Sequence, residues 1–285
     1  MANTKFFGPR TLAETLDILD TYREEALIVN GGTDIVAQIA SGAVNPSVIV
    51  YIQNVQQLKE IRSGGGHVCL GGAVTYVQIQ TSPDCQQFSA MQKAIAECGS
   101  PSIRVVGTPA GNIGTAAPAA DCNVALIALG AEVVLANKGG ERIVPMADMF
   151  VAAWKTQRQP NEIIKEIHIP VVKNASGSGF VKLAKRKAQD IAQVSAAVSL
   201  SVDNKVIEEI CIALGAVAPT AVRAKSLEAL AKGKTLEAAM EAVNGQIPDE
   251  AALRNPRNKA YKEAVMGVAV ARSIKQAFEA VERGN

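Results

Sequence analysis

Histidine and aromatic residues are scarce in this chain, and their scarcity weakens several routes to catalysis. Among 285 residues there are two histidines, His67 and His168, and aromatic side chains make up 4%. His67 follows three glycines in a predicted hairpin loop, and His168 lies on a predicted exposed strand face. Neither is placed like a general base or like the partner of a nucleophilic serine. The sequence therefore predicts no catalytic acid, base or nucleophile.

Cysteines are few and scattered, which argues against a metal centre held by this chain. The five cysteines stand at positions 69, 85, 98, 122 and 211, and no two form a paired-ligand motif. With two histidines in the whole chain, neither a zinc site nor an iron–sulfur cluster is expected. We expect reduced structural thiols and no metal site.

An excess of charge of one sign and a long apolar run are both missing. The chain has 29 basic and 27 acidic residues, scattered so that no patch for nucleic acid or for a membrane surface is predicted. The longest apolar stretch, residues 124–136, is too short to span a bilayer and contains Glu132. The N-terminus lacks the apolar core of a signal peptide. We expect a cytoplasmic protein without nucleic-acid or membrane partners.

Alternating helical and strand patterns fill the first part of the chain. They predict helices at 11–23, 88–98 and 123–130, strands at 26–29, 47–53 and 131–137, and two short strands around a glycine-rich turn within 58–75. The length suggests two domains, with a boundary near 173–178 and a flexible stretch at 174–179. The sequence therefore predicts an α/β arrangement in the first domain.

The second part of the chain has a different pattern. Strands are predicted at 161–170 and from 180 on, two of them joined by a turn at Asp203 and Asn204, and helices follow. The last helix, within 259–281, carries Val265, Val268, Ala271, Ile274 and Phe278 on one face. That face is core or, alternatively, a groove for a partner.

A first glycine segment, residues 28–38 with the sequence IVNGGTDIVAQ, interrupts an apolar strand with two glycines and two small polar residues. Paired glycines let the backbone turn sharply and let a ligand approach its amides, which suits phosphate oxygens. The alternative is a plain strand-to-helix turn with Asp34 as the helix cap.

A second glycine segment spans residues 105–131. It combines Gly107, Gly111 and Gly114 with Thr108, Asn112 and Thr115, ahead of a helical run that follows Asp121. The spacing is not the Gly-x-Gly-x-x-Gly of a dinucleotide fold, and neither a P-loop nor a nucleophile elbow occurs in the chain. Two such segments suggest one ligand whose phosphates lie between two loops.

Together the two segments resemble the flavin-binding subunit of molybdenum hydroxylases, as in the xanthine dehydrogenase family and carbon monoxide dehydrogenases. Residues 30–35 match the family's Ala-Gly-Gly-Thr-Asp-Leu loop, and residues 108–112 with Asp121 largely match Thr-Ile-Gly-Gly-Asn and the Asp nine residues later. Residues 70–75, 182–200 and 214–224 match further family segments, so the resemblance covers nearly the whole chain.

The resemblance implies an α+β fold: a two-subdomain α/β FAD-binding domain of the vanillyl-alcohol-oxidase type at 1–174, then an antiparallel sheet with helices at 178–285. It implies two pyrophosphate-facing loops, Asp121 on the adenosine ribose, Ile164 against the isoalloxazine and Lys182 near its polar edge. Without the family resemblance, the sequence predicts Asp121 as a helix cap and Lys182 as a solvated strand residue. The implied FAD-binding residues are Ile28, Val29, Asn30, Gly31, Gly32, Thr33, Asp34, Ile35, Gly71, Thr108, Pro109, Ala110, Gly111, Asn112, Thr115, Pro118, Asp121, Ile164 and Lys182.

Four departures from the family pattern bear on the ligands. Ala110 replaces the first glycine of the second loop, and Cys98 stands where an aromatic often stacks on adenine. Ala153 stands where vertebrate-type members carry a tyrosine near the nicotinamide site, and Gln189 replaces an acidic residue close to the flavin in those members. The departures leave the expectation of FAD intact and put NAD⁺ in question.

The implied function is electron transfer in a complex. A large subunit would hold the molybdenum cofactor, a small subunit would hold [2Fe-2S] clusters, and FAD on this chain would pass electrons to NAD⁺ or another acceptor. A dimer of heterotrimers and an N-heterocycle or xanthine type of substrate are implied too. The alternatives are a stand-alone FAD-dependent oxidoreductase of the same fold and a non-catalytic FAD-binding assembly subunit.

Overall fold

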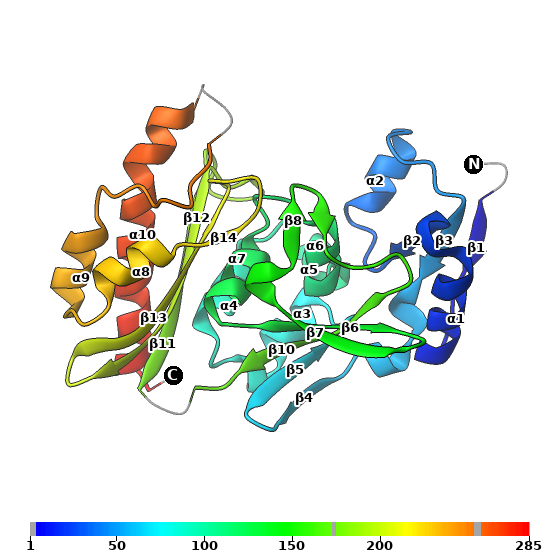
Figure 1. Ribbon diagram of the computed structural model, residues 1–285, viewed down its shortest axis with the longest axis horizontal. Coiled ribbons are helices and arrows are strands. Elements are labelled where there is room, and N and C mark those ends of the chain that lie inside the picture. Colours follow the sequence, from blue (N-terminus) through cyan, green and yellow to red (C-terminus); the bar gives the residue numbers. More distant parts are fainter. Residues whose placement is uncertain (1–3, 173–174, 254–257, 285) are drawn as a thin grey trace.

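The structure of the protein is a computed structural model that describes residues 4–172, 175–253 and 258–284. Of the four sheets within these residues, the three that have three or more strands follow one another along the long axis, with helices between and outside them (Figure 1). This mixed architecture confirms the α+β class expected from the sequence.

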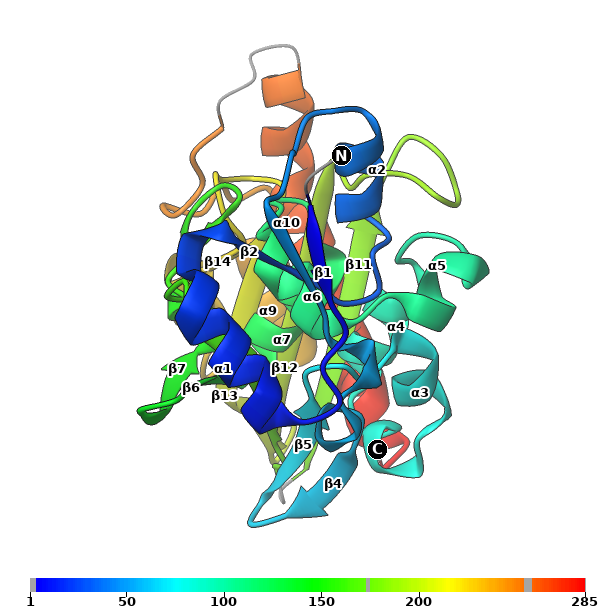
Figure 2. The ribbon, with the colours of Figure 1, turned by 90° about the vertical axis from the view of Figure 1, so that its right-hand side faces the viewer.

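The N-terminal subdomain is a small parallel sheet with strand order β1-β3-β2, which confirms the α/β pattern expected here. Helix α1 packs beside it; Figure 2 shows α1 and the three strands from that end. The side chain of Thr11 caps α1 by accepting from the Glu14 amide at 3.1 Å, and Leu19 is fully buried. The elements are β1 (Lys5–Phe7), α1 (Leu12–Tyr22), β2 (Ala26–Val29), α2 (Ile35–Ala40) and β3 (Val48–Tyr51).

The second subdomain is a five-stranded antiparallel sheet with the order β4-β5-β10-β6-β7. Gly65 and Gly66, with φ of 60° and 82°, form the tight turn between β4 and β5 that the sequence predicts. Its strands, with the hairpin of β8 and β9, are β4 (Ile61–Gly64), β5 (His67–Gly71), β6 (Glu132–Asn137), β7 (Gly140–Pro145), β8 (Phe150–Ala152), β9 (Lys155–Thr156) and β10 (Ile163–Pro170).

Five helices belong to this subdomain, and α7 is the most enclosed of them. All of its residues are buried, because it lies against α4 on one side and against β12 and β13 on the other. A helix that is apolar all round fits only such a place. The helices are α3 (Tyr76–Thr81), α4 (Ser89–Ala96), α5 (Pro101–Val106), α6 (Pro109–Thr115) and α7 (Asp121–Ala128).

The C-terminal part is an antiparallel sheet, β11-β12-β13-β14, covered on its outer face by α8, α9 and α10 (Figure 1). Asn204 and Lys205, with φ of 49° and 65°, make the predicted turn between β12 and β13. The elements are β11 (Ser176–Leu183), β12 (Val194–Asp203), β13 (Val206–Gly215), β14 (Val222–Arg223), α8 (Lys225–Ala231), α9 (Leu236–Val243) and α10 (Lys259–Glu282).

The flexible stretch predicted at 174–179 is wrong for residues 176–179, which begin β11 and are largely buried. Its glycines serve close packing. A Cβ on Gly177 would lie 2.1 Å from the Ala277 carbonyl oxygen, and one on Gly179 would lie 2.3 Å from that of Ser273. Residues 173–174, part of the predicted domain boundary, lie outside the described residues, as do residues 1–3 and 285 of the predicted domain ranges.

The apolar face predicted for the last helix is core. Ala271, Ile274 and Phe278 are buried against β11 and β12, whereas Val265 and Val268 are half-buried. The buried stripe continues through other residues of α10, chiefly small ones. Within the described ranges, no helix combines the length and the apolar character needed to span a membrane.

Candidate functional site

The two glycine segments lie side by side. A Cβ on Gly31 would sit 2.0 Å from the carbonyl oxygen of Val106, so the first segment rests directly on the end of α5. The Thr115 hydroxyl donates to Asp34 Oδ2 at 3.2 Å, across 81 positions of sequence. We call residues 30–34 the first turn and residues 105–123 the second segment.

The first turn is held from below by Asn30. This buried side chain donates to the Gly72 carbonyl at 2.6 Å and accepts from Gln53 Nε2 at 2.6 Å. Strand β2, with Ile28 and the buried Val29, leads into the turn. Because its side-chain amide is already hydrogen-bonded to Gly72 and Gln53, Asn30 supports the backbone of the turn.

The backbone of the first turn offers free donors. Gly32 has φ of +71°, a conformation that favours glycine. Among the described residues, the amides of Gly31, Gly32 and Thr33 donate to no acceptor. Thr33 is exposed and Gly31 and Gly32 are half-buried, so these amides form a donor surface at the molecular surface, suited to phosphate oxygens.

Asp34 does not play the capping role that the simpler interpretation gives it. It stands at the N-cap of α2, ahead of Ile35, but its side chain makes no capping hydrogen bond. The carboxylate instead accepts from Thr115 at the end of α6. Asp34 thus joins the two segments.

The second segment is not the loop that the sequence suggests at 108–112; it forms the start of helix α6. Thr108 caps the helix by accepting from the Gly111 amide at 3.0 Å. Pro109 takes the first helical position, where its missing N–H leaves no bond unmade, and Ala110 faces the core with 6% exposure. Pro109 and Ala110, which replaces a glycine of the family pattern, are therefore compatible with the local backbone.

Three buried side-chain oxygens in the second segment have no hydrogen-bond partner within the described part of the chain. They are Asn112 Oδ1, Asp121 Oδ1 and Asn123 Oδ1, and Asn123 Nδ2 donates weakly to the Asn112 carbonyl at 3.4 Å. A buried acceptor without a donor is costly, on the order of 1–3 kcal/mol each. Their grouping on α6 and at the start of α7 fits a ligand that brings hydroxyl or amide donors.

Asp121 forms a buried ion pair with Lys182. Lys182 Nζ lies 2.6 Å from Asp121 Oδ2 and 3.1 Å from the Glu97 carbonyl oxygen, and the two side chains are 7% and 6% exposed. Burial raises the pKa of Asp121 to about 6, against the opposing effect of Lys182. The simpler interpretations are wrong, because Ala120 holds the N-cap of α7 and Lys182 is not solvated.

The remaining predicted residues lie around these two segments and touch protein backbone. A Cβ on Gly71 would lie 2.3 Å from the Leu58 carbonyl oxygen, so packing alone explains that glycine. The Pro118 carbonyl accepts from the Ala216 amide at 2.8 Å and so ties the site to β13. Ile164 is 6% exposed, and its carbonyl abuts Gly72, next to the first turn.

The sequence analysis missed several residues of the site. Asn123 stands two positions beyond Asp121 and could have been noticed as a second polar side chain in an apolar helix. Gln53 and the Glu97 carbonyl carry no sequence signal. Tyr76 donates its amide to the Gly107 carbonyl at 2.9 Å, and burial raises the pKa of its buried phenol well above the usual value.

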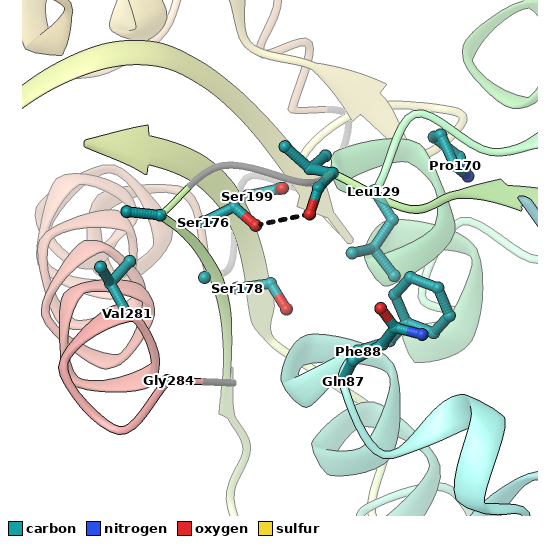
Figure 3. A pocket seen from close by; sticks show the side chains of 12 residues that line it. Gln87, Phe88, Leu129, Pro170, Ser176, Ser178, Ser199, Val281 and Gly284 are labelled. Atoms are coloured by element: carbon teal, nitrogen blue, oxygen red, sulfur yellow. Dashed lines mark hydrogen bonds between the residues drawn. The ribbon is translucent and has the colours of Figure 1, made fainter. Parts of the chain in front are cut away.

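Two pockets flank the β11 strand. One, of about 360 Å³, opens beside Lys182 and is also lined by Glu97, Arg104, residues 183–184 and residues 186–190. The other, of about 330 Å³, lies between the N-terminus of α4 and the C-terminus of α10; Figure 3 shows Ser176, Ser178 and Ser199 along it. It contains none of the predicted residues, and its Ser178 hydroxyl already accepts from the Ala90 amide at 3.0 Å.

Comparisons with known families and proteins agree with this geometry. The family described as the FAD binding domain in molybdopterin dehydrogenase matches residues 2–172, and the CO dehydrogenase flavoprotein C-terminal domain matches residues 179–277. The first match takes in the first turn and the whole second segment.

Individual proteins match over nearly the whole length. The nicotinate dehydrogenase FAD-subunit of Eubacterium barkeri is 31% identical over 279 residues, 94% of either chain. The carbon monoxide dehydrogenase medium chain of Hydrogenophaga pseudoflava is 28% identical over 96% of either chain. A solved carbon monoxide dehydrogenase structure from Hydrogenophaga pseudoflava superimposes with a TM-score of 0.89 over 98% of both chains, at 28% identity.

Proposed function

The chain belongs to the family of FAD-binding subunits of molybdopterin dehydrogenases, and from this premise we propose that it accepts electrons from a partner subunit and delivers them to a diffusible acceptor. FAD is its cofactor, and it forms part of an oxidoreductase complex. The direction of electron flow, the partner clusters and the acceptor are the proposed part. The observation that carries the proposal is the contact between the first turn and the second segment, which offer unpartnered donors and acceptors to one ligand.

The residues present fit FAD at both of its polar parts. The free amides of Gly31, Gly32 and Thr33 suit the pyrophosphate, because backbone N–H groups bind phosphate oxygens without rearranging. The unpartnered Asp121 Oδ1 suits a ribose hydroxyl, which would donate to it. The remaining residues that we assign to FAD hold these groups in place.

Lys182 and Asp121 serve the same end of the ligand in this proposal. Their side chains meet at 2.6 Å, so a ribose on Asp121 places Lys182 at the adenosine end and not beside the isoalloxazine. Ile164, at the other side of the first turn, remains the residue that we assign to the isoalloxazine.

Bound FAD supplies exchange between single-electron and paired-electron transfer, which an electron-relay subunit needs. The chain itself then has to bind and orient the cofactor, and no acid–base pair is required of it. We assign the electron donor to a small subunit with [2Fe-2S] clusters and the substrate chemistry to a large molybdenum subunit, in a dimer of heterotrimers. The names of the relatives, an FAD-subunit and a medium chain, support such a division.

The acceptor in this proposal is NAD⁺ or another carrier, since Ala153 and Gln189 depart from the family pattern near the nicotinamide site and the flavin. The stand-alone oxidoreductase is not favoured, since relatives that cover nearly the whole chain are named as subunits. We place the complex in the cytoplasm, in keeping with five unpaired cysteines, which are typical of a reducing compartment.

The proposal is tested on the complex purified through a tag on this chain. We expect co-purified large and small subunits, FAD and molybdenum in a ratio of one to one, and flavin that NADH reduces under anaerobic conditions. Asp121→Ala should lower the flavin content at least tenfold, while leaving the subunits together. Its matched control is Asp203→Ala, at the exposed turn between β12 and β13.

Other outcomes would contradict defined parts of the proposal. Flavin that substrate reduces and NADH does not would overturn NAD⁺ as the acceptor. A flavin-loaded chain that purifies alone and turns over a substrate would restore the stand-alone alternative. Unchanged flavin content in Asp121→Ala would remove Asp121 from the site.

A further inference from the structure

The central strands of the five-stranded sheet carry a cluster of three side chains of metal-binding types. Cys69 lies on β5, and Glu166 and His168 lie on β10. One ligand atom from each, the thiol sulfur, a carboxylate oxygen and a ring nitrogen, lies within 4.8 Å of the other two. Among the described residues, this is the sole such group of histidine, cysteine and acidic side chains.

Strand register explains why these three side chains meet. His168 and Cys69 are directly opposed in the antiparallel pair of β10 with β5, so they point to the same face. Glu166 stands two residues before His168 and shares that face, because side chains alternate along a strand. Ile167 and Ile169, between and beyond them, are buried in the core on the opposite face. The ligand positions are therefore fixed by a central, fully paired strand.

We propose that Cys69, Glu166 and His168 bind one Zn²⁺ ion, with the fourth coordination position open to solvent. Sulfur, imidazole and carboxylate together are a zinc set, whereas Ca²⁺ and Mg²⁺ take oxygen ligands. His168 Nε2 and Glu166 Oε2 are 2.8 Å apart. A tetrahedral ion needs about 3.3 Å between two such atoms, so these two must separate by about half an ångström. The thiol sulfur, which lies within 4.8 Å of both, must come to about 3.6 Å from each.

Charged neighbours leave the required oxygen free. The Arg62 guanidinium pairs with Glu166 Oε1 at 2.5 Å, and Lys165 Nζ lies 3.9 Å from the same oxygen. Oε2, the oxygen that faces His168, is left for the ion, and Arg62 would orient the carboxylate from behind. Glu132 stands opposite His168 on β6 and adds a second acidic group to this face.

The ion would join β5 to β10 just below the first turn. Gly72, directly after β5, abuts the Ile164 carbonyl of β10 and accepts from Asn30, which supports the turn. Zinc bound here would make this support more rigid without touching the cofactor. At free zinc about a hundred times its Kd, the melting temperature of the chain should rise by about 4–5 °C.

The test uses the full chain, stripped with a chelator, equilibrated with ZnCl₂ at micromolar free metal and analysed for zinc by elemental analysis. We expect one zinc per chain, lost in Cys69→Ser and in His168→Gln together with the thermal shift. Cys211→Ser is the thiol control, since Cys211 lies on β13 and contacts the Ile127 carbonyl. His67→Gln is the imidazole control, since His67 Nδ1 already contacts the Gly65 carbonyl at 3.1 Å.

Three results would overturn the proposal. One is a wild-type chain that binds no zinc at micromolar metal, and another is zinc that is retained in Cys69→Ser. Either would show that Glu166 and His168 are a hydrogen-bonded pair beside an unrelated thiol. Zinc lost in His67→Gln would show that the ligand set is wrong. Circular dichroism of each variant separates loss of metal from loss of fold.

Discussion

In our proposal the first turn and the second segment bind the same cofactor by opposite means. In the first turn the working groups are half-exposed backbone amides, and the side chain of Asn30 only supports them. In the second segment the working groups are side-chain oxygens, and those of Asp121 and Asn123 belong to residues of 5% and 0% exposure. One region depends on conformation and the other on buried charge and hydrogen bonding.

This difference predicts which kind of change, a bulkier side chain or a shift of pH, affects cofactor binding in each region. Backbone donors carry no titratable charge, so the first turn should respond to the bulk of a side chain and hardly to pH. A carboxylate inside the protein should respond to pH and to the loss of its counter-ion. Four changes, ordered by expected effect, test this contrast.

Lys182→Met should have the largest effect. It leaves the Asp121 carboxylate buried beside an apolar side chain, which costs about 3–5 kcal/mol in the free energy of unfolding. Denaturant unfolding of the FAD-free chain at pH 7 measures it. The control is Lys232→Met, whose exposed pair with Glu209 should contribute no more than about 1 kcal/mol.

The double variant Lys182→Met, Asp121→Asn sharpens this result. Without the carboxylate there is no uncompensated charge, so most of the lost stability should return. If Lys182→Met costs no more than Lys232→Met, the buried pair does not stabilise the fold.

Gly31→Ala should come next and should act on cofactor binding. The new Cβ would meet the Val106 carbonyl oxygen at 2.0 Å, which forces the first turn away from the second segment. Overpacking of about 1–3 kcal/mol weakens FAD binding about 5- to 150-fold. Flavin fluorescence titration measures the affinity. Gly64→Ala, whose Cβ meets nothing within 4 Å, is the control, and equal affinity in both variants would contradict the prediction.

A change of pH should have a smaller effect than these substitutions and should act on the second segment. Burial raises the pKa of Asp121 from 3.8 to about 6, so the folded chain binds this proton more tightly than the unfolded chain. Ionisation of Asp121 therefore destabilises the FAD-free fold as pH rises from about 4 through 6. A ribose hydroxyl donates best to the ionised form, so FAD affinity should rise about tenfold from pH 5 to 7.5. Asp121→Asn should flatten this profile, and an unchanged slope would exclude Asp121 as its source.

Much of the fold could be predicted from local patterns. The alternation of strands and helices before residue 137, the glycine turn at Gly65 and Gly66, and the turn at Asn204 all follow from period and turn chemistry. The prediction failed at Gly177 and Gly179, because the sequence alone does not distinguish a glycine that makes room for a neighbouring helix from a glycine in a flexible linker. Thr108 and Pro109 are likewise predicted in a loop from the family pattern, but they begin a helix. A threonine cap and a proline at the first helical position are the local signals of that helix start.

Only those residues of the site that lie within continuous sequence motifs could be predicted. The two segments were found because their residues are consecutive, whereas the partner of Asp121 stands 61 positions away on another domain's strand. Pairings of this kind depend on tertiary packing, which has no local signature. The same holds for Cys69 and His168, which strand register brings together from distant parts of the chain.

Thr115→Val should have the smallest effect and isolates the link between the two regions. It removes one hydrogen bond to Asp34, 3.2 Å long and at the surface, while the side chain keeps its shape. Such a bond contributes about 0.5–1 kcal/mol, so FAD affinity should fall about two- to fivefold. Thr81→Val is the control, because the Thr81 hydroxyl bonds only to carbonyls of its own helix. If the two variants bind FAD equally, the first turn and the second segment are held together by Gly31 packing alone, and Gly31→Ala should then show the upper end of its predicted range.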